Sequence, residues 1–302
     1  MMLTLPAEPG RERAVRAARL WFERCPDRLG GEFAATVRDN PPPPDRIHLS
    51  QLSPGDIWAT VGTTIQPPGD YEGEPLEWDA PYSAASWQEL LRKLGELPSV
   101  AAFGASTWSA RGWHGPPSYT VDMGIDYGFV ELGSTIDDAL ANDPAGQRRV
   151  LAAVREVAEV ANPVAVAVAT NFKRIETPLE RALNRFQGRA EAGSWLRNYG
   201  WLTVLSDEMT ERVGGLHRLR SSGAFVEVEP LAAGGTWLVA TDTWDEYGPE
   251  QANRLFELLA PVLPPGRPQL TQFGAPVTPG GELVRTALPN VVAERDPREI
   301  TG

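Results

Sequence analysis

Cysteine and histidine are scarce in this sequence. Its 302 residues include a single cysteine, Cys25, and three histidines, His48, His114 and His217. One cysteine excludes an intramolecular disulfide and any metal site built from several thiolates. No two of the histidines stand at a spacing typical of metal ligands. We therefore expect neither a catalytic metal nor a cofactor.

Long apolar runs are also missing. The longest, residues 163–169, is far shorter than the roughly 20 residues of a membrane-spanning helix. The start of the chain, MMLTLPAEPGRER, has neither the apolar run nor the cleavage site of a secretory signal. These features lead us to expect a cytoplasmic protein that does not bind membranes.

Basic residues are outnumbered. The 28 Lys and Arg face 40 Asp and Glu, which gives a formal charge of −12. This balance argues against direct nucleic-acid binding, because that function usually needs a basic surface that displaces counterions. An acidic surface suits a basic protein partner, although the charge could also serve solubility alone.

Hydrophobic periodicity predicts an α+β fold. Apolar stripes at helical spacing and alternating or β-branched runs are interspersed without regular βαβ repetition, which favours a mostly antiparallel sheet with helices packed on one face. The expected helices are 11–22, 83–97, 143–161 (with a start as early as 134), 177–185 and 249–263. The expected strands are 57–65, 100–110, 118–132, 163–170, 201–205, 224–229 and 236–241.

The order of these elements suggests how the chain is organised. We expect an N-terminal arm at 1–10, one α+β domain at 11–265, and a Pro/Gly-rich tail at 266–302. The domain could consist of two halves, 11–132 and 133–265, the second near a ferredoxin-like layout. Residues 67–81 are expected to form an acidic loop.

Residues that could carry catalysis stand without recognisable partners. Asp122 and Asp126 share one face of a predicted strand, but four residues of strand put them about 13 Å apart, too far to hold one ion. Ser106 in FGASTW lacks the second glycine of a nucleophile elbow. His114 is expected in a turn, and Cys25 is expected to be packed. A hydrolase or carbohydrate-active enzyme that uses an unrecognised carboxylate pair remains an alternative.

The segment GSWLRNYGWLTVLSDEMTERVGG, residues 193–215, is the most informative in the chain. Residues 201–205 read as a strand that is followed at once by a helical turn. Ser206 is a good N-cap, and Asp207 and Glu208 suit the positive end of the helix. Gly214 and Gly215 can end it through a left-handed residue.

The YGWLTVLSDE run, the following Gly-Gly and the later GTWLVATDTWDEYG resemble immunity proteins of bacterial polymorphic toxin and type VI secretion systems. The resemblance is to the immunity protein 52 family and its relatives, and it covers residues 119–265. It implies a small cytoplasmic protein, paired with a toxin, that binds and blocks that one cognate toxin, a nuclease domain. It carries over no catalytic residue.

Two of the ten tryptophans, Trp78 and Trp244, lie among acids in expected loops. Exposed aromatics ringed by acids suit a protein interface, because Trp and Tyr dominate binding hot spots. They could instead cover the edge of the core. The candidate partner-binding residues are Tyr71, Glu72, Glu74, Trp78, Asp79, Asp242, Trp244, Asp245, Glu246 and Tyr247.

Overall fold

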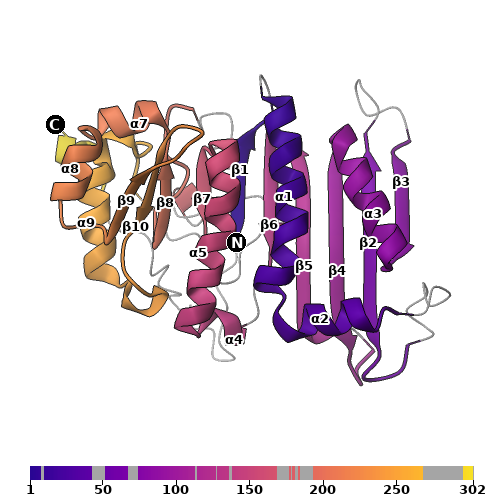
Figure 1. Ribbon diagram of the computed structural model, residues 1–302. Helices are drawn as coiled ribbons and strands as arrows, with labels where there is room; N and C mark the ends of the chain where they lie inside the picture. Colours follow the sequence, from indigo (N-terminus) through magenta and orange to yellow (C-terminus); the bar gives the residue numbers. More distant parts are fainter. Residues whose placement is uncertain are drawn as a thin grey trace. The chain divides into compact units, whose positions relative to one another are not determined.

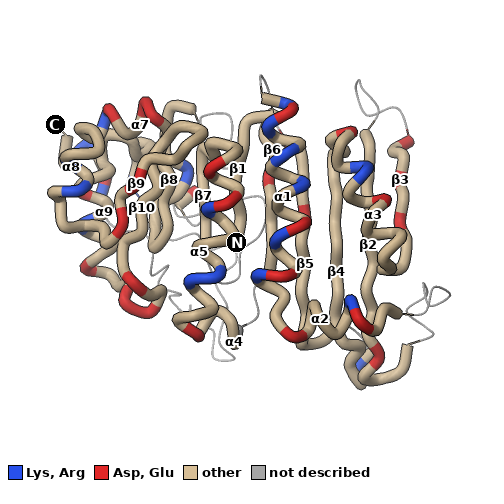
Figure 2. Tube along the Cα trace, viewed as in Figure 1, with Lys and Arg blue, Asp and Glu red and all other residues tan. Residues whose placement is uncertain are grey.

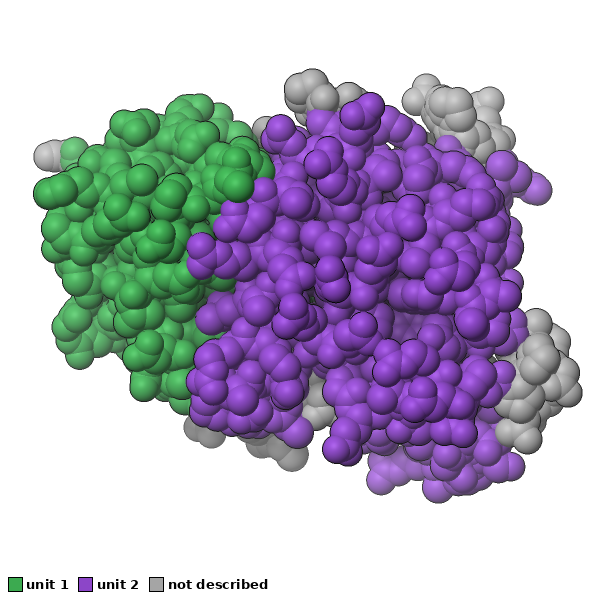
Figure 3. All heavy atoms as spheres, in the orientation of Figure 1, with its two compact units in different colours: residues 1, 162–302 green, residues 2–161 purple. Residues whose placement is uncertain are grey.

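The computed structural model describes residues 1–7, 10–42, 52–66, 74–112, 114–126, 128–135, 138–168, 177, 179–180, 183, 193–267 and 295–301. The chain divides into two compact units (Figure 3). Unit 2 comprises Met2–Ala161, and unit 1 comprises Asn162–Gly302 together with Met1. Both combine helices with antiparallel sheet, so the predicted α+β class is confirmed.

Unit 2 is built on an antiparallel sheet. Its strands follow the order β3-β2-β4-β5-β6-β1 across the sheet. Their bounds are β1 (Met2–Pro6), β2 (Ile57–Ile65), β3 (Leu76–Pro81), β4 (Val100–Trp108), β5 (His114–Asp126) and β6 (Phe129–Ser134). Along β2 and β4 buried positions alternate with half-exposed ones, as expected for a sheet with one covered face.

The helices of unit 2 cover that face. Figure 1 shows α1, α2 and α3 on the same side of the sheet, with α5 beside α1. Residues of α1 spaced three or four apart, among them Ala14, Ala18, Trp21 and Cys25, are buried toward it. The bounds are α1 (Arg11–Leu29), α2 (Gly31–Asp39), α3 (Ala84–Lys93), η2 (Leu94–Glu96), α4 (Asp138–Ala141) and α5 (Pro144–Ala161).

Three features of unit 2 differ from the sequence expectations. Residues 1–10, expected as an arm, contain β1, which is buried and pairs with β6. The expected loop 67–81 contains the edge strand β3, which hydrogen-bonds along β2. The single strand expected at 118–132 is a hairpin of β5 and β6, because Gly128 with φ +77° turns the chain.

Unit 1 contains a three-stranded antiparallel sheet in the order β8-β10-β9. The strands are β8 (Leu202–Leu205), β9 (Glu227–Pro230) and β10 (Thr236–Val239), and β7 (Ala165–Ala167) packs beside β8. The helices are α7 (Asp207–Arg212), α8 (Gly215–Ser221), η3 (Trp244–Glu246), α9 (Pro249–Leu259) and η4 (Ala260–Val262). The described part of the expected ferredoxin-like layout is thus a central β10 flanked by β8 and β9.

The informative segment folds as its sequence predicts. The backbone N–H of Met209 donates to the Ser206 hydroxyl at 3.2 Å, which caps α7. Gly214 has φ +98° and separates α7 from α8. Every residue of β8 is buried, although β8 lies at the edge of the described three-stranded sheet. The expected strands 224–229 and 236–241 correspond to β9 and β10, which pair as an antiparallel hairpin.

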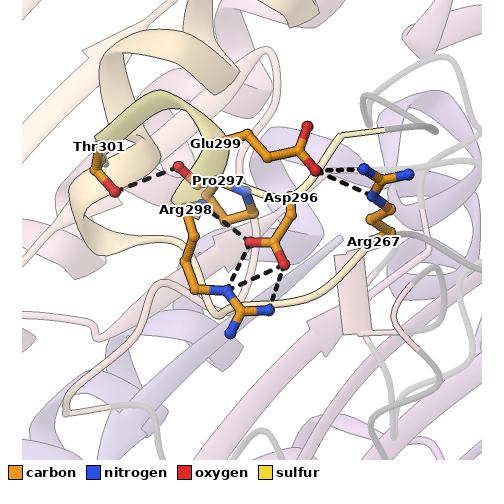
Figure 4. Close-up of polar contacts among 6 residues, drawn as sticks. All are labelled: Arg267, Asp296, Pro297, Arg298, Glu299 and Thr301. Carbon is orange, nitrogen blue, oxygen red and sulfur yellow. Dashed lines mark hydrogen bonds and ion pairs between the residues drawn. The ribbon is translucent and has the colours of Figure 1, made fainter.

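The last described residues belong to unit 1. Figure 4 shows Asp296 hydrogen-bonded to Arg298 and Arg267 paired with Glu299, at 2.5 and 2.6 Å between the nearest atoms. The short helix α10 (Arg298–Thr301) packs against η4. The expected tail 266–302 therefore ends in an ordered segment. In the part of the chain that the structure describes, no helix is both long and apolar enough to cross a membrane.

Candidate partner-binding surfaces

The turn between β10 and α9 presents three acids to solvent. Asp242, Asp245 and Glu246 are all exposed, and Trp244 between them is half-exposed. Figure 2 shows acids where the chain leaves β10. No base follows in the sequence until Arg254, and carboxylates at the turn attract basic groups of a partner. The turn therefore combines negative charge with a half-exposed indole.

Hydrogen bonds and ring packing hold this turn in one conformation. The side chain of Glu246 accepts from the Thr243 backbone N–H at 3.2 Å as part of a capping box around η3. The Trp201 indole N–H donates to the Thr241 carbonyl oxygen at 2.9 Å. The rings of Trp201 and Trp244 stack edge to face, with centroids 5.9 Å apart. The fully buried Trp201 ring therefore supports the Trp244 ring on its core side.

Tyr247 does not belong to this exposed surface. It is buried, and its hydroxyl has no hydrogen-bond partner among the described residues. Burial, with a smaller contribution from Tyr199, raises the pKa of the Tyr247 phenol well above its ordinary value. The expectation that Tyr247 is an exposed contact residue is wrong, because its ring faces the core where α9 begins.

The second candidate cluster lies on the edge strand β3 instead of a loop. Trp78 is half-exposed on the helix-covered side, where the Lys93 ammonium of α3 lies 5.3 Å from its ring centroid. Asp79 points the other way, because successive side chains of a strand alternate between faces. Its carboxylate lies over Gly62 of β2, where a Cβ atom would be 2.0 Å from it. Glu74 is exposed just before the strand.

The described candidate residues are divided between the two units. Glu74, Trp78 and Asp79 belong to unit 2, whereas Asp242 to Tyr247 belong to unit 1. Tyr71 and Glu72 lie outside the described residues. Within unit 2 the acid and the aromatic of β3 serve opposite faces of the sheet. The turn of unit 1 alone keeps acids and an accessible aromatic together.

A serine and a histidine that the sequence analysis treated separately lie in contact. The Ser106 hydroxyl and the His114 Nδ1 atom are 2.7 Å apart, across the β4–β5 hairpin. His114 begins β5 instead of lying in a turn, and a register shift between Ser106 and Thr107 brings the two together. The His114 ring also packs against Trp58 and Trp108, at centroid distances of 4.5 and 5.3 Å. No sequence motif predicts this contact.

This contact has one element of nucleophilic catalysis, a hydroxyl beside a potential base. A working triad also needs an acid that orients the imidazole and donors for an oxyanion. None of the hydrogen bonds between described residues joins an acid to His114. The imidazole is instead positioned by the two tryptophan rings, so the arrangement is that of a packed polar contact at a sheet end.

The remaining chemistry-bearing residues are dispersed. Among the described residues, no three His, Cys, Asp or Glu side chains lie close enough to share a metal ion. Asp122 and Asp126 both lie on β5, His217 is exposed on α8, and His48 is outside the described residues. Cys25 is fully buried within α1, and this burial raises the pKa of its thiol well above the ordinary value.

One buried ion pair was not foreseen from the sequence. The Arg197 guanidinium donates to both carboxylate oxygens of Glu180, at 2.6 and 3.0 Å, and both side chains are buried. The Thr177 backbone N–H donates to the same carboxylate at 2.8 Å. These contacts fix the chain just before Trp201, whose ring supports Trp244. The pair therefore stabilises the segment that leads into Trp201.

Comparisons with known proteins give a distant structural likeness. No protein-family model matches the sequence, and no curated protein matches it significantly. The structure is similar to that of the Pseudomonas aeruginosa T6SS protein PA0821, with a TM-score of 0.45 and 12% sequence identity. The likeness covers 87% of this chain and 75% of the other. A likeness of this degree assigns neither a fold family nor a function.

Proposed function

We propose that this chain is an immunity protein, which binds one cognate bacterial toxin and neutralises it. The toxin is a nuclease domain of a polymorphic toxin or type VI secretion system, and binding covers its active or substrate-binding site. The observation that carries the proposal is the turn of unit 1, with exposed Asp242, Asp245 and Glu246 around Trp244. The resemblance of residues 119–265 to immunity proteins supports the same function.

The chemistry of the turn fits a nuclease as partner. A nuclease presents Lys and Arg where it binds phosphates, and carboxylates on an inhibitor complement these groups. Attraction between such charges speeds association, and salt screens it over roughly 8 Å at physiological ionic strength. Trp244 adds an apolar anchor that slows release, worth on the order of 2 kcal/mol if it is central to the interface.

The turn is also held in place before binding. Trp201, the capping box and the start of α9 fix its backbone, so little conformational freedom is lost when a partner docks. The proposed activity is occupation of the toxin and not chemistry on a substrate, and its place of action is the cytoplasm of the toxin-producing or neighbouring cell. We propose accordingly that the protein is not an enzyme.

The test is mutation of the turn. In the double variant Trp244→Ala, Asp245→Ala we expect weaker binding of the toxin domain encoded beside this gene, and loss of protection in cells that express it. Glu211→Ala on α7 is the control, because it also removes one exposed acid from unit 1. Folded double variants that bind and protect like the parent would show that the turn is not the binding surface.

Variants of Ser106 and His114 distinguish inhibition by binding from an enzymatic function. If the protein acts by binding, Ser106→Ala and His114→Ala variants should protect cells as well as the parent does, provided both fold. Loss of protection in both variants with toxin binding intact would favour a hydrolase that uses the Ser106–His114 contact.

A further inference from the structure

The outer edge of β3 carries backbone groups that point away from the unit 2 sheet. β3 is the terminal strand of the described sheet and is flanked by β2 (Figure 1). The Tyr82 N–H donates to the Ala59 carbonyl oxygen of β2 at 2.9 Å, and the pairing continues along β3 without a register shift. Hydrogen-bonded positions alternate along an antiparallel strand, so Glu77 and Asp79 direct their N–H and C=O groups away from β2.

Prolines mark the two ends of this edge. Pro81 occupies the next outward-facing position after Asp79, and Pro75 directly precedes β3. A proline has no N–H to donate to an added strand. Among the described residues, none forms a hydrogen bond with the outward backbone groups of Glu77 and Asp79. The part of the edge that can donate to another strand is therefore the short segment from Glu77 to Asp79.

The side chains of β3 give this edge two chemically different sides. Glu77 and Asp79 are exposed on the side away from the helices, and neither β2 nor β3 contains a lysine or arginine. On the other side Leu76 is 70% exposed, and Trp78 is half-exposed beside the Lys93 ammonium. An added strand would meet acids with one set of alternate side chains and apolar groups with the other.

A second copy of this chain is a poor occupant for the edge. Two copies of β3 paired antiparallel would bond through their outward-facing residues, so Glu77 or Asp79 of one copy would stand opposite Glu77 or Asp79 of the other. Like charges directly opposite each other destabilise a sheet. The same two acids stabilise a strand that presents Lys or Arg at those positions. The edge therefore selects a basic strand.

We propose that the free edge of β3 accepts a short strand of the toxin domain, with basic residues beside Glu77 and Asp79 and apolar residues beside Leu76 and Trp78. The inference rests on the proposed function and adds a second contact to it. Main-chain hydrogen bonds to an open sheet edge supply affinity, and alternate side chains supply specificity. A nucleic acid has no strand backbone to offer and would be repelled by the two acids.

Amide hydrogen exchange, followed by NMR, tests the backbone pairing directly. In the free protein the Glu77 and Asp79 amides should exchange quickly, because they face away from β2. In the complex with the purified toxin domain we expect them to exchange at least roughly tenfold more slowly. The Trp78 and Ala80 amides face β2 and should be protected in both states. A partner that contacts β3 only through side chains would not accept from the two outward amides.

A matched pair of variants separates the backbone from the charge. Glu77→Ala removes the acid, whereas Glu77→Pro also removes the outward N–H. Proline is tolerated on an edge strand where the N–H faces solvent, so both variants should fold. We expect Glu77→Ala to weaken toxin binding severalfold and Glu77→Pro to weaken it by roughly a further tenfold. Circular dichroism, together with unchanged protection of the Val61 amide on β2, establishes that each variant is folded.

The outcomes separate this inference from the proposed function. A complex that forms without new protection of the Glu77 and Asp79 amides would overturn strand addition, while the immunity role stands. Equal binding by folded Glu77→Pro and Glu77→Ala would do the same. Failure of the parent to bind the toxin domain would overturn both. Protection of the two amides in the free protein, together with a dimer in solution, would show that a second copy occupies the edge and would also overturn the inference.

Discussion

Removal of one partner from the buried ion pair of unit 1 should destabilise that unit strongly. The Arg197 side chain is 1% exposed and that of Glu180 is 6% exposed. In an Arg197→Met variant the Glu180 carboxylate would keep only the Thr177 N–H as a described partner. An unpaired buried charge of this kind costs about 3–5 kcal/mol. We expect a loss of that size in the free energy of unfolding of unit 1.

The double variant separates pairing from burial. In Glu180→Met, Arg197→Met no charge is left buried, but the Thr177 N–H loses its acceptor, which costs about 1–3 kcal/mol. The expected loss is therefore about 1–3 kcal/mol, and not the sum of two single losses, about 6–10 kcal/mol. Arg254→Met is the control, because its ion pair with Glu250 has a similar 2.6 Å length but is exposed. It should cost no more than about 1 kcal/mol.

Native-state hydrogen exchange measures these losses within unit 1. The amides of Trp237 and Leu238 belong to β10, the central strand of its sheet, and are buried. Their exchange reports the opening of unit 1 separately from unit 2. A single variant that costs less than about 1 kcal/mol, or a double variant as unstable as the sum, would refute the argument that the pair is a desolvated charge network.

Three further predictions concern other parts of the fold. Cys25 should not react with a thiol reagent in the native protein and should react fully in denaturant, because burial raises the pKa of its thiol. Fast labelling of Cys25 in the native protein would contradict its burial. The Arg298 guanidinium holds the pKa of Asp296 below its ordinary value, so the ion pair should anchor α10 fully above pH ~4 and less as the pH falls below that. The rate at which a carboxypeptidase releases the C-terminal residues measures this anchoring. Release that is equally fast at pH 7 and at low pH would contradict the prediction. Gly235→Ala should destabilise unit 1 by more than about 1–2 kcal/mol, the cost of a positive φ alone, because its Cβ would also lie 2.5 Å from the Leu205 carbonyl oxygen. Gly223 also has a positive φ but has open space around its Cβ position, so Gly223→Ala should cost less. Chemical denaturation of both variants measures the difference.

Local patterns predicted the elements that depend on local chemistry. β2 matches its expected bounds because IWATVGTTI is an uninterrupted run of strand-forming residues. Ser206 caps α7 because the capping hydrogen bond joins residues three apart in sequence. β3 was missed, since LEWDAP carries acids and a proline and becomes a strand only through its pairing with β2.

Which candidate residues are exposed, and which of them lie together, depends more on tertiary structure than the secondary structure does. The sequence predicted that Asp242, Asp245 and Glu246 would be exposed, because charged side chains are rarely buried. It could not show that Tyr247 faces the core, since an aromatic among acids fits either environment. The contacts of Ser106 with His114 and of Glu180 with Arg197 arise from register and packing, which no spacing in the sequence specifies.

The proposed immunity function has one direct test, titration of the purified toxin domain encoded beside this gene with the purified protein. The account predicts that nuclease activity falls to zero at one equivalent, and that the association rate decreases as salt rises, because acids of this chain meet bases of the toxin. Undiminished nuclease activity in excess protein, under conditions where both proteins are folded, would contradict the account.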